Sequence, residues 1–175
     1  FLDGTLTKSG FVDFFETCLE TEVLLTNNLA RAGKLIQSFK KVAVDQASDE
    51  QRQFNLHQYT DEIVTSLSPT LRISKVNVEN KLDPSIVLYS FAGAYSQVLT
   101  NLIANSLLHG FENGRLAGTI SLTSEDHEDF CTITYQDSGK GMSAEVLQHI
   151  YDPFYTTTRA EGGSGLGMNI VYNLI

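Results

Sequence analysis

The N-terminal part of the chain carries apolar residues at alternating intervals of three and four, broken only at Glu22. Ser9 is a suitable N-cap, and the pattern predicts one helix from there to about residue 46. A helix of about 35 residues exceeds the usual globular length, which favours pairing in a coiled coil or bundle over packing on its own domain. We call its apolar positions the apolar seam: Phe11, Phe15, Cys18, Leu25, Leu29, Ala32, Ile36 and Phe39.

Beyond a polar stretch at 45–52, the pattern changes to short segments that alternate between strand and helix character. The strands mostly follow one another as expected hairpins, so we predict an α+β fold in two layers and no doubly wound parallel sheet. The predicted strands are 54–56, 76–80, 86–90, 119–124 and 131–137, and the predicted helices are 59–67, 95–111, 143–150 and 166 onwards.

Composition narrows the possible classes of protein. The 175 residues suffice for one domain with a helical appendage, and 42% hydrophobic with 19% charged residues is typical of a globular protein. The net charge of -9 repels phosphate backbones and argues against a nucleic-acid partner.

The cysteines and the apolar runs indicate the setting of the chain. Cys18 and Cys131 are too few for a disulfide framework or a zinc site, and both are predicted to be reduced core residues in a cytoplasmic protein. No apolar run approaches the ~18 residues of a membrane span, so we expect no direct membrane contact by this segment.

Four clusters along the second part contain residues suited to a nucleotide. The first, QVLTNLIANSLLHGF, places Asn101 and Asn105 four residues apart on one face of a predicted helix. We expect Val98, Leu102 and Leu107 on the opposite face. Carboxamide oxygens suit Mg²⁺, which shares its ligands with substrate phosphates. Surface polarity or a helix cap would also explain such a pair.

The second cluster, DSGKGM, begins at the end of an apolar strand. Asp137 could accept a hydrogen bond from an exocyclic amine such as that of adenine, and Gly139 and Gly141 would let a ring approach the backbone. A simple turn after the strand is the alternative.

The third cluster, YDPFYTTTR, places apolar residues before three threonines and Arg159. This order suits a lid that closes on phosphates, although an ordinary surface loop has the same composition. The fourth cluster, GGSGLGMNIVYNLI, runs from glycines directly into a helix. Its freed backbone amides and the positive end of the helix would bind phosphate.

In this order, the clusters resemble the N, G1, F and G2 boxes of sensor histidine kinases, which share the Bergerat fold of the GHKL superfamily with gyrase-type ATPases and heat-shock chaperones. The resemblance implies a two-layer Bergerat-type sandwich at 54–175, C-terminally truncated because the strands that usually follow the fourth box are missing. It also implies a linker at 47–53 and, at 1–46, the second helix of a dimerisation and histidine-phosphotransfer hairpin. The first helix, with the phosphoacceptor histidine, would precede Phe1.

The resemblance further implies roles for individual residues. Asn105 and Asn101 would coordinate Mg²⁺ and act in catalysis with Arg159, while Asp137 would hold the adenine amine. Many family members carry Lys or Arg where this chain has Leu108, so Arg159 or Lys140 would carry more of the phosphate charge. His109 would line the nucleotide or, alternatively, cap its helix. The other implied nucleotide-binding residues are Gly139, Gly141, Phe154, Thr157, Thr158, Gly163, Gly165, Leu166 and Gly167.

One position bears on the expected reaction. Gyrase-type relatives place a general-base Glu four residues before the magnesium Asn, and here that position is Asn101, whose amide cannot take a proton. We therefore expect transfer of the γ-phosphoryl of Mg-ATP to a histidine of the hairpin, and onward relay to a response-regulator aspartate. A gyrase-like or chaperone-like ATPase and a non-catalytic nucleotide-binding dimerisation module are the alternatives.

The expected partners follow from the same resemblance. They are a second copy of the chain, joined through the helix hairpin to give a homodimer, and a response-regulator receiver domain. The expected location is the cytoplasm, either for the whole protein or for the cytoplasmic part of an inner-membrane sensor.

Overall fold

The computed structural model describes residues 8–46, 50–157 and 165–175, and the chain divides between Gln37 and Ser38 into two compact units. The helix α1 (Lys8–Gln46) confirms the predicted long helix and begins within one residue of the expected start. In the single chain, every described residue of the apolar seam is exposed. Cys18 is one of them, so the prediction that it is a core residue is wrong; Cys131 is half-buried against the core, and both thiols are free.

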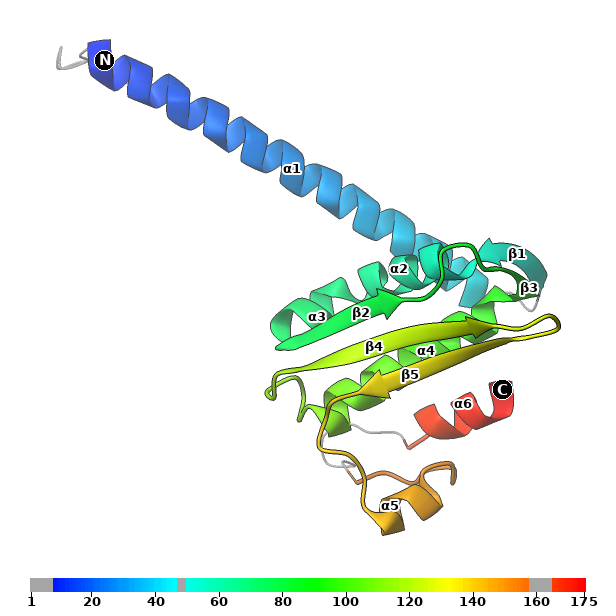
Figure 1. Ribbon diagram of the computed structural model, residues 1–175. Helices are drawn as coiled ribbons and strands as arrows, with labels where there is room; N and C mark the ends of the chain where they lie inside the picture. Colours follow the sequence, from blue (N-terminus) through cyan, green and yellow to red (C-terminus); the bar gives the residue numbers. More distant parts are fainter. Residues whose placement is uncertain (1–7, 47–49, 158–164) are drawn as a thin grey trace. The chain divides into compact units, whose positions relative to one another are not determined.

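The strands of the second unit form two small sheets (Figure 1). Strands β1 and β3 pair antiparallel, while β4 lies between β2, to which it is parallel, and β5, to which it is antiparallel. The bounds are β1 (Gln51–Asn55), β2 (Val76–Lys81), β3 (Val87–Phe91), β4 (Gly118–Asp126) and β5 (Cys131–Asp137).

Two expectations about the strands are wrong. Only β4 and β5 form a hairpin among the described strands, because β2 and β3 pair with different partners. Leu82 and Ile86, in the connection between β2 and β3, are 2% and 5% exposed, so the connection is anchored in the core and the two strands separate. In addition, β1 begins at Gln51, so residues 51–53, predicted as linker, pair with β3.

The helices of this unit include α2 and α4, which lie along one face of the β2-β4-β5 sheet (Figure 1). The α+β prediction is therefore confirmed, and the core lies between this helical layer and the sheet. The bounds are α2 (Leu56–Ser66), α3 (Ser68–Ile73), α4 (Ala92–Asn105), the π-helical turn η1 (Ser106–Gly110), α5 (Ala144–His149) and α6 (Gly167–Leu174).

The buried face of this helix matches the expected one only in part: Leu107, in η1, is 8% exposed as predicted, but two other residues differ. Leu99 and Ile103 are 2% and 1% exposed, whereas Val98 and Leu102 are only half-buried. A step of two residues turns a helix by about 200°, so the residues that lie opposite an asparagine are two positions away from it. Because Leu99 and Ile103 pack on the sheet, Asn101 and Asn105 point away from the core.

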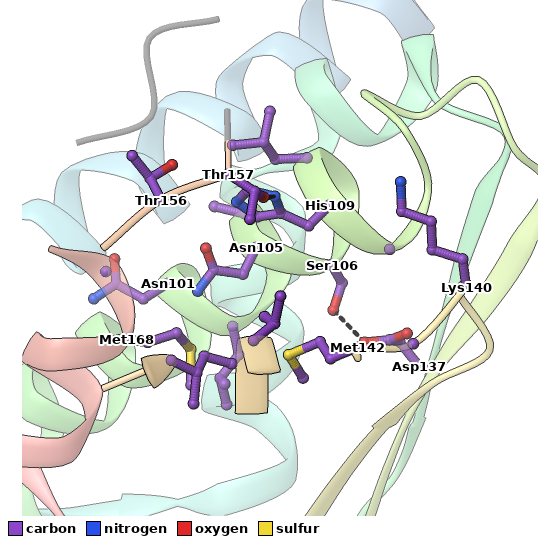
Figure 2. Close-up of a pocket in the computed structure, with 18 of the residues that line it drawn as sticks. Asn101, Asn105, Ser106, His109, Asp137, Lys140, Met142, Thr156, Thr157 and Met168 are labelled. Atoms are coloured by element: carbon purple, nitrogen blue, oxygen red, sulfur yellow. Dashed lines mark hydrogen bonds between the residues drawn. The ribbon is translucent and has the colours of Figure 1, made fainter. Parts of the chain in front are cut away.

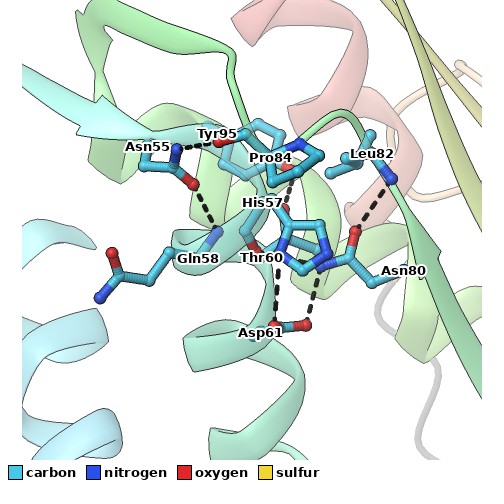
Figure 3. A network of polar contacts seen from close by, with 9 residues as sticks. All are labelled: Asn55, His57, Gln58, Thr60, Asp61, Asn80, Leu82, Pro84 and Tyr95. Carbon is cyan, nitrogen blue, oxygen red and sulfur yellow. Dashed lines mark hydrogen bonds and ion pairs between the residues drawn. The ribbon is translucent and has the colours of Figure 1, made fainter.

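Two asparagines fix α2 against β2 and the segment that follows β2 (Figure 3). The Oδ1 of Asn55 accepts the N–H of Gln58 at 2.8 Å and so caps α2, while its Nδ2 donates to the carbonyl of Pro84 at 2.7 Å. The Nδ2 of Asn80 donates to the Oδ1 of Asp61 at 2.7 Å. These bonds hold the helix whose buried face completes the core under α4.

We predict that Asn55→Ala lowers the free energy of unfolding by about 1 kcal/mol or more, because it removes both the N-cap of α2 and the bond to Pro84. Urea unfolding followed by circular dichroism measures the change. Asn77→Ala, at an exposed position of β2, is the matched control. Equal unfolding midpoints for the two variants would contradict the role assigned to Asn55.

Candidate functional site

A cavity of about 1000 Å³ is lined by residues of α4, η1, the segment after β5 and the start of α6 (Figure 2). Such a volume is at the upper end of the range of small-molecule sites. All four clusters singled out from the sequence contribute to its wall. The predicted site residues that line it are Asn101, Asn105, His109, Asp137, Gly141, Thr157, Gly165 and Gly167.

One end of the cavity is formed by the carboxylate of Asp137. This residue ends β5 on the same face as Tyr135, and that face packs towards the helical layer. Its Oδ2 accepts a hydrogen bond from the Oγ of Ser106 at 2.8 Å, and its Oδ1 accepts the N–H of Gly139 at 2.9 Å. Two donors on separate elements therefore hold the carboxylate in one orientation.

The two glycines of the second cluster are favoured for different physical reasons. A Cβ on Gly139 would lie 2.7 Å from the Cα of Gly110, so only glycine lets the turn after β5 rest on η1. The N–H of Lys140 donates to the carbonyl of Gly110 at 3.1 Å and fastens this contact. Gly141 has φ +70°, a left-handed conformation that suits glycine. Gly139 therefore shapes this end through the backbone and does not itself line the cavity.

The other end of the cavity is formed by two carboxamides of α4 and the start of α6. Within the described part of the chain, the Nδ2 atoms of Asn101 and Asn105 are buried without a hydrogen-bond partner. A Cβ on Gly167 would lie 3.6 Å from the Nδ2 of Asn105 and 3.9 Å from the Oδ1 of Asn101. The first and fourth clusters, more than sixty positions apart, thus meet here, because α6 packs against α4.

The loop between the third and fourth clusters is closed at its base by its backbone. The N–H of Phe154 donates to the carbonyl of Gly165 at 2.9 Å, and both residues have positive φ angles, +65° and +68°. Phe154 is 62% exposed, and its main chain anchors this segment through the bond to Gly165. The expected anchoring role of its side chain stays a prediction. Neither Phe154 nor Leu166 lines the cavity, and the predicted Thr158, Arg159 and Gly163 lie outside the described residues.

Two side chains connect the cavity wall to neighbouring segments. The Nδ1 of His109 lies 3.3 Å from the Oγ1 of Thr157, so the end of η1 contacts the start of the loop. The Nζ of Lys140 lies 3.4 Å from the Oε1 of Glu112. Figure 2 shows the Lys140 side chain on the same side of the cavity as Asp137, with its Nζ pointing away from that carboxylate. Lys140 lines the cavity, and the expectation that it carries phosphate charge stays a prediction.

Sequence reasoning missed several residues of the site. Ser106 and Tyr135 touch Asp137 or its partners, Gly110 permits the contact of η1 with the turn, and Met142 and Met168 line the cavity. The strand alternation that places Tyr135 on the same face as Asp137 was a usable signal for one of them. Burial raises the pKa of Tyr135 well above its usual value, and the charge of the neighbouring Asp137 adds to the rise.

Comparison with known proteins agrees with this geometry. Residues 92–175 match the family described as histidine kinase-, DNA gyrase B-, and HSP90-like ATPase. Sporulation kinase E of Bacillus subtilis (strain 168) is 26% identical over 172 residues, which cover 95% of this chain and 22% of that protein. Sporulation kinase B of the same strain is 25% identical over 175 residues, which cover 100% of this chain and 38% of that protein. The chain therefore spans less than half of either kinase.

A solved structure gives the same result. The catalytic domain of the histidine kinase ThkA aligns with a TM-score of 0.62 at 26% identity, covering 72% of this chain and 80% of that chain. The matched family segment contains α4, the turn after β5 and α6, the three parts that enclose the cavity. The chain therefore carries an ATP-binding domain of the GHKL superfamily, of the histidine kinase type.

Proposed function

We propose that this domain binds Mg-ATP and transfers the γ-phosphoryl group to a histidine of a dimerisation hairpin, for relay to an aspartate of a response regulator. The observation that carries the proposal is the meeting of Asn101, Asn105 and Gly167 at one end of a cavity whose other end is Asp137. A cavity with a hydrogen-bond acceptor at one end and donors at the other suits a nucleotide that lies along it.

The amide end has the chemistry of a phosphate and magnesium site. A buried amide without a partner costs about 1–3 kcal/mol, so two of them side by side favour a ligand that pairs with both. A half-turn of either carboxamide presents its oxygen in place of its nitrogen, and oxygen is the ligand that Mg²⁺ prefers. In this proposal, Asn105 and Asn101 hold the ion, which supplies charge neutralisation when bound. The first N–H groups of α6, starting at Gly167, face the phosphates.

The wall of the cavity favours transfer over hydrolysis. Among the described residues that line it, the carboxylates are Glu112 and Asp137, one paired with Lys140 and the other held by Ser106 at the far end. No described carboxylate lies beside the two amides to deprotonate a water molecule. A γ-phosphoryl group bound there would await an imidazole, a better nucleophile than water near neutral pH.

The helix α1 supports a second copy of the chain as a partner. Its described seam residues are exposed, including Leu25 at 56% and Leu29 at 72%, and pairing would bury them. We propose that residues 1–46 contain the second helix of the hairpin of a homodimer, and that the catalytic domain begins with β1, three residues earlier than the expected 54.

A response regulator is the second proposed partner. The kinase ThkA has been solved in complex with the response regulator protein TrrA, and we extend that kind of partnership to this chain by its similarity to ThkA. Within the described ranges, none of the helices has both the length and the apolar character needed to cross a bilayer. The proposed location of this domain is the cytoplasm, where a receiver domain could reach it.

We predict that Asn105→Ala weakens Mg-ATP binding by on the order of tenfold or more, because it removes a magnesium ligand. Calorimetric titration of the whole chain with ATP, with Mg²⁺ and then with EDTA, measures the effect. The loss should appear in Mg²⁺ and largely vanish in EDTA, and Asn77→Ala should bind like the wild type. An equal loss under both conditions would contradict the assignment of Asn105 to the metal.

We predict that Asn101→Glu raises the release of free phosphate from ATP by roughly 10²-fold, since it places a general base beside the γ-phosphate. Asn101→Gln is the control, because Gln is as long as Glu but cannot take a proton, and it should not raise phosphate release. Release is measured with γ-labelled ATP, together with acid-labile labelling of an added hairpin that contains the acceptor histidine. Rapid release by the wild type with no labelling of the hairpin would favour the ATPase alternative.

A further inference from the structure

A row of hydroxyl groups lies behind the carboxylate of Asp137. The Oγ of Ser106 is 2.8 Å from the Oδ2 of Asp137 and 2.8 Å from the phenol oxygen of Tyr135. Ser106 is 5% exposed and is the first residue of η1, while Tyr135 precedes Asp137 by two positions on β5. The row therefore joins the helical layer to the sheet at the base of the cavity.

The direction of these hydrogen bonds follows from the number of protons available. A carboxylate only accepts hydrogen bonds, so the single hydroxyl hydrogen of Ser106 goes to the Oδ2 of Asp137. Tyr135 must then donate to the Oγ of Ser106. Because burial raises the pKa of Tyr135, its phenol keeps the proton that it donates. The row has one orientation, from Tyr135 through Ser106 to Asp137.

The carboxylate of Asp137 has few free hydrogen-bond acceptor positions for a nucleobase. The hydroxyl of Ser106 occupies one position on Oδ2, and the N–H of Gly139 occupies one on Oδ1, so any turn of the carboxylate breaks both bonds. Adenine offers one exocyclic amine, which needs a single remaining acceptor position. Guanine offers two adjacent donors, its N1–H and its 2-amino group, and a carboxylate that turns freely could bind them with both oxygens. The O6 of guanine, in contrast, would be repelled by the negative charge of the carboxylate.

We propose that Ser106, supported by Tyr135, is a positioning residue that makes the site select adenine over guanine, because it prevents the carboxylate of Asp137 from turning to bind the edge of guanine. This inference rests on the proposed nucleotide-binding function. It assigns base selection to a buried hydroxyl that contacts the carboxylate and needs no contact with the nucleotide itself.

The test compares the dissociation constants of the whole chain for ATP and for GTP, each measured calorimetrically with Mg²⁺. Ser106→Ala leaves Oδ2 without its donor, and we expect the ratio of the GTP constant to the ATP constant to fall by on the order of tenfold. Tyr135→Phe keeps the donor on Ser106 but loses its orientation, so the ratio should fall in the same direction by less.

Two matched controls separate base selection from general loss of a buried hydroxyl. Ser96→Ala and Tyr95→Phe each remove a hydroxyl from a side chain of α4 that does not line the cavity. Both should keep the wild-type ratio, even where their thermal stability falls. Circular dichroism establishes that each variant is folded, and if Ser106→Ala unfolds, the near-isosteric Tyr135→Phe decides the result.

The possible failures have different meanings. If Ser106→Ala and Tyr135→Phe fold, still bind ATP and keep the wild-type ratio, the positioning role is overturned while the proposed nucleotide binding stands. An equal loss of affinity for ATP and GTP would assign Ser106 a merely structural role and would also overturn the inference. If the wild-type chain binds no ATP, the proposed function fails and this inference fails with it.

Discussion

The contact between the start of α6 and the amide face of α4 is the constraint on which the rest of the site depends. Gly167 lies against Asn101 and Asn105, close enough that a Cβ added there would be in van der Waals contact with both carboxamides. Burial of Leu99 and Ile103 on the opposite face fixes the rotation of α4, so the same packing that forms the core points the amides at α6. Core stability and site geometry are therefore consequences of one helix orientation.

From this contact, the cavity extends to a carboxylate that the fold holds equally firmly. Ser106 of the helical layer and Gly139 of the turn after β5 both donate hydrogen bonds to Asp137, and this turn packs against Gly110. Both ends of the site are thus organised before any ligand arrives, and preorganised polar groups need little rearrangement on binding. A main-chain hydrogen bond from the N–H of Phe154 to the carbonyl of Gly165 joins the third cluster to the fourth.

The sequence predicted those features that depend on local pattern. The long helix, the α+β class, and the order of Asn105, Asp137 and the glycine-rich helix start could all be inferred. Strand partners could not, because alternation specifies which face of β2 is buried but not that β4, forty residues away, is its parallel neighbour. The buried face of α4 was misassigned because apolar residues occupy several sides of that helix. The hydrogen bond from Ser106 to Asp137 could not be predicted either, because a buried hydroxyl has no sequence pattern of its own.

A structure of the chain with Mg²⁺ and a non-hydrolysable ATP analogue tests the central claim most directly. The account predicts the ion at about 2.1 Å from a carboxamide oxygen of Asn105, the phosphates on the first N–H groups of α6, and the exocyclic amine of adenine on Asp137. A nucleotide that lies outside this cavity, or one whose phosphates are remote from Asn105 and Gly167, would contradict it.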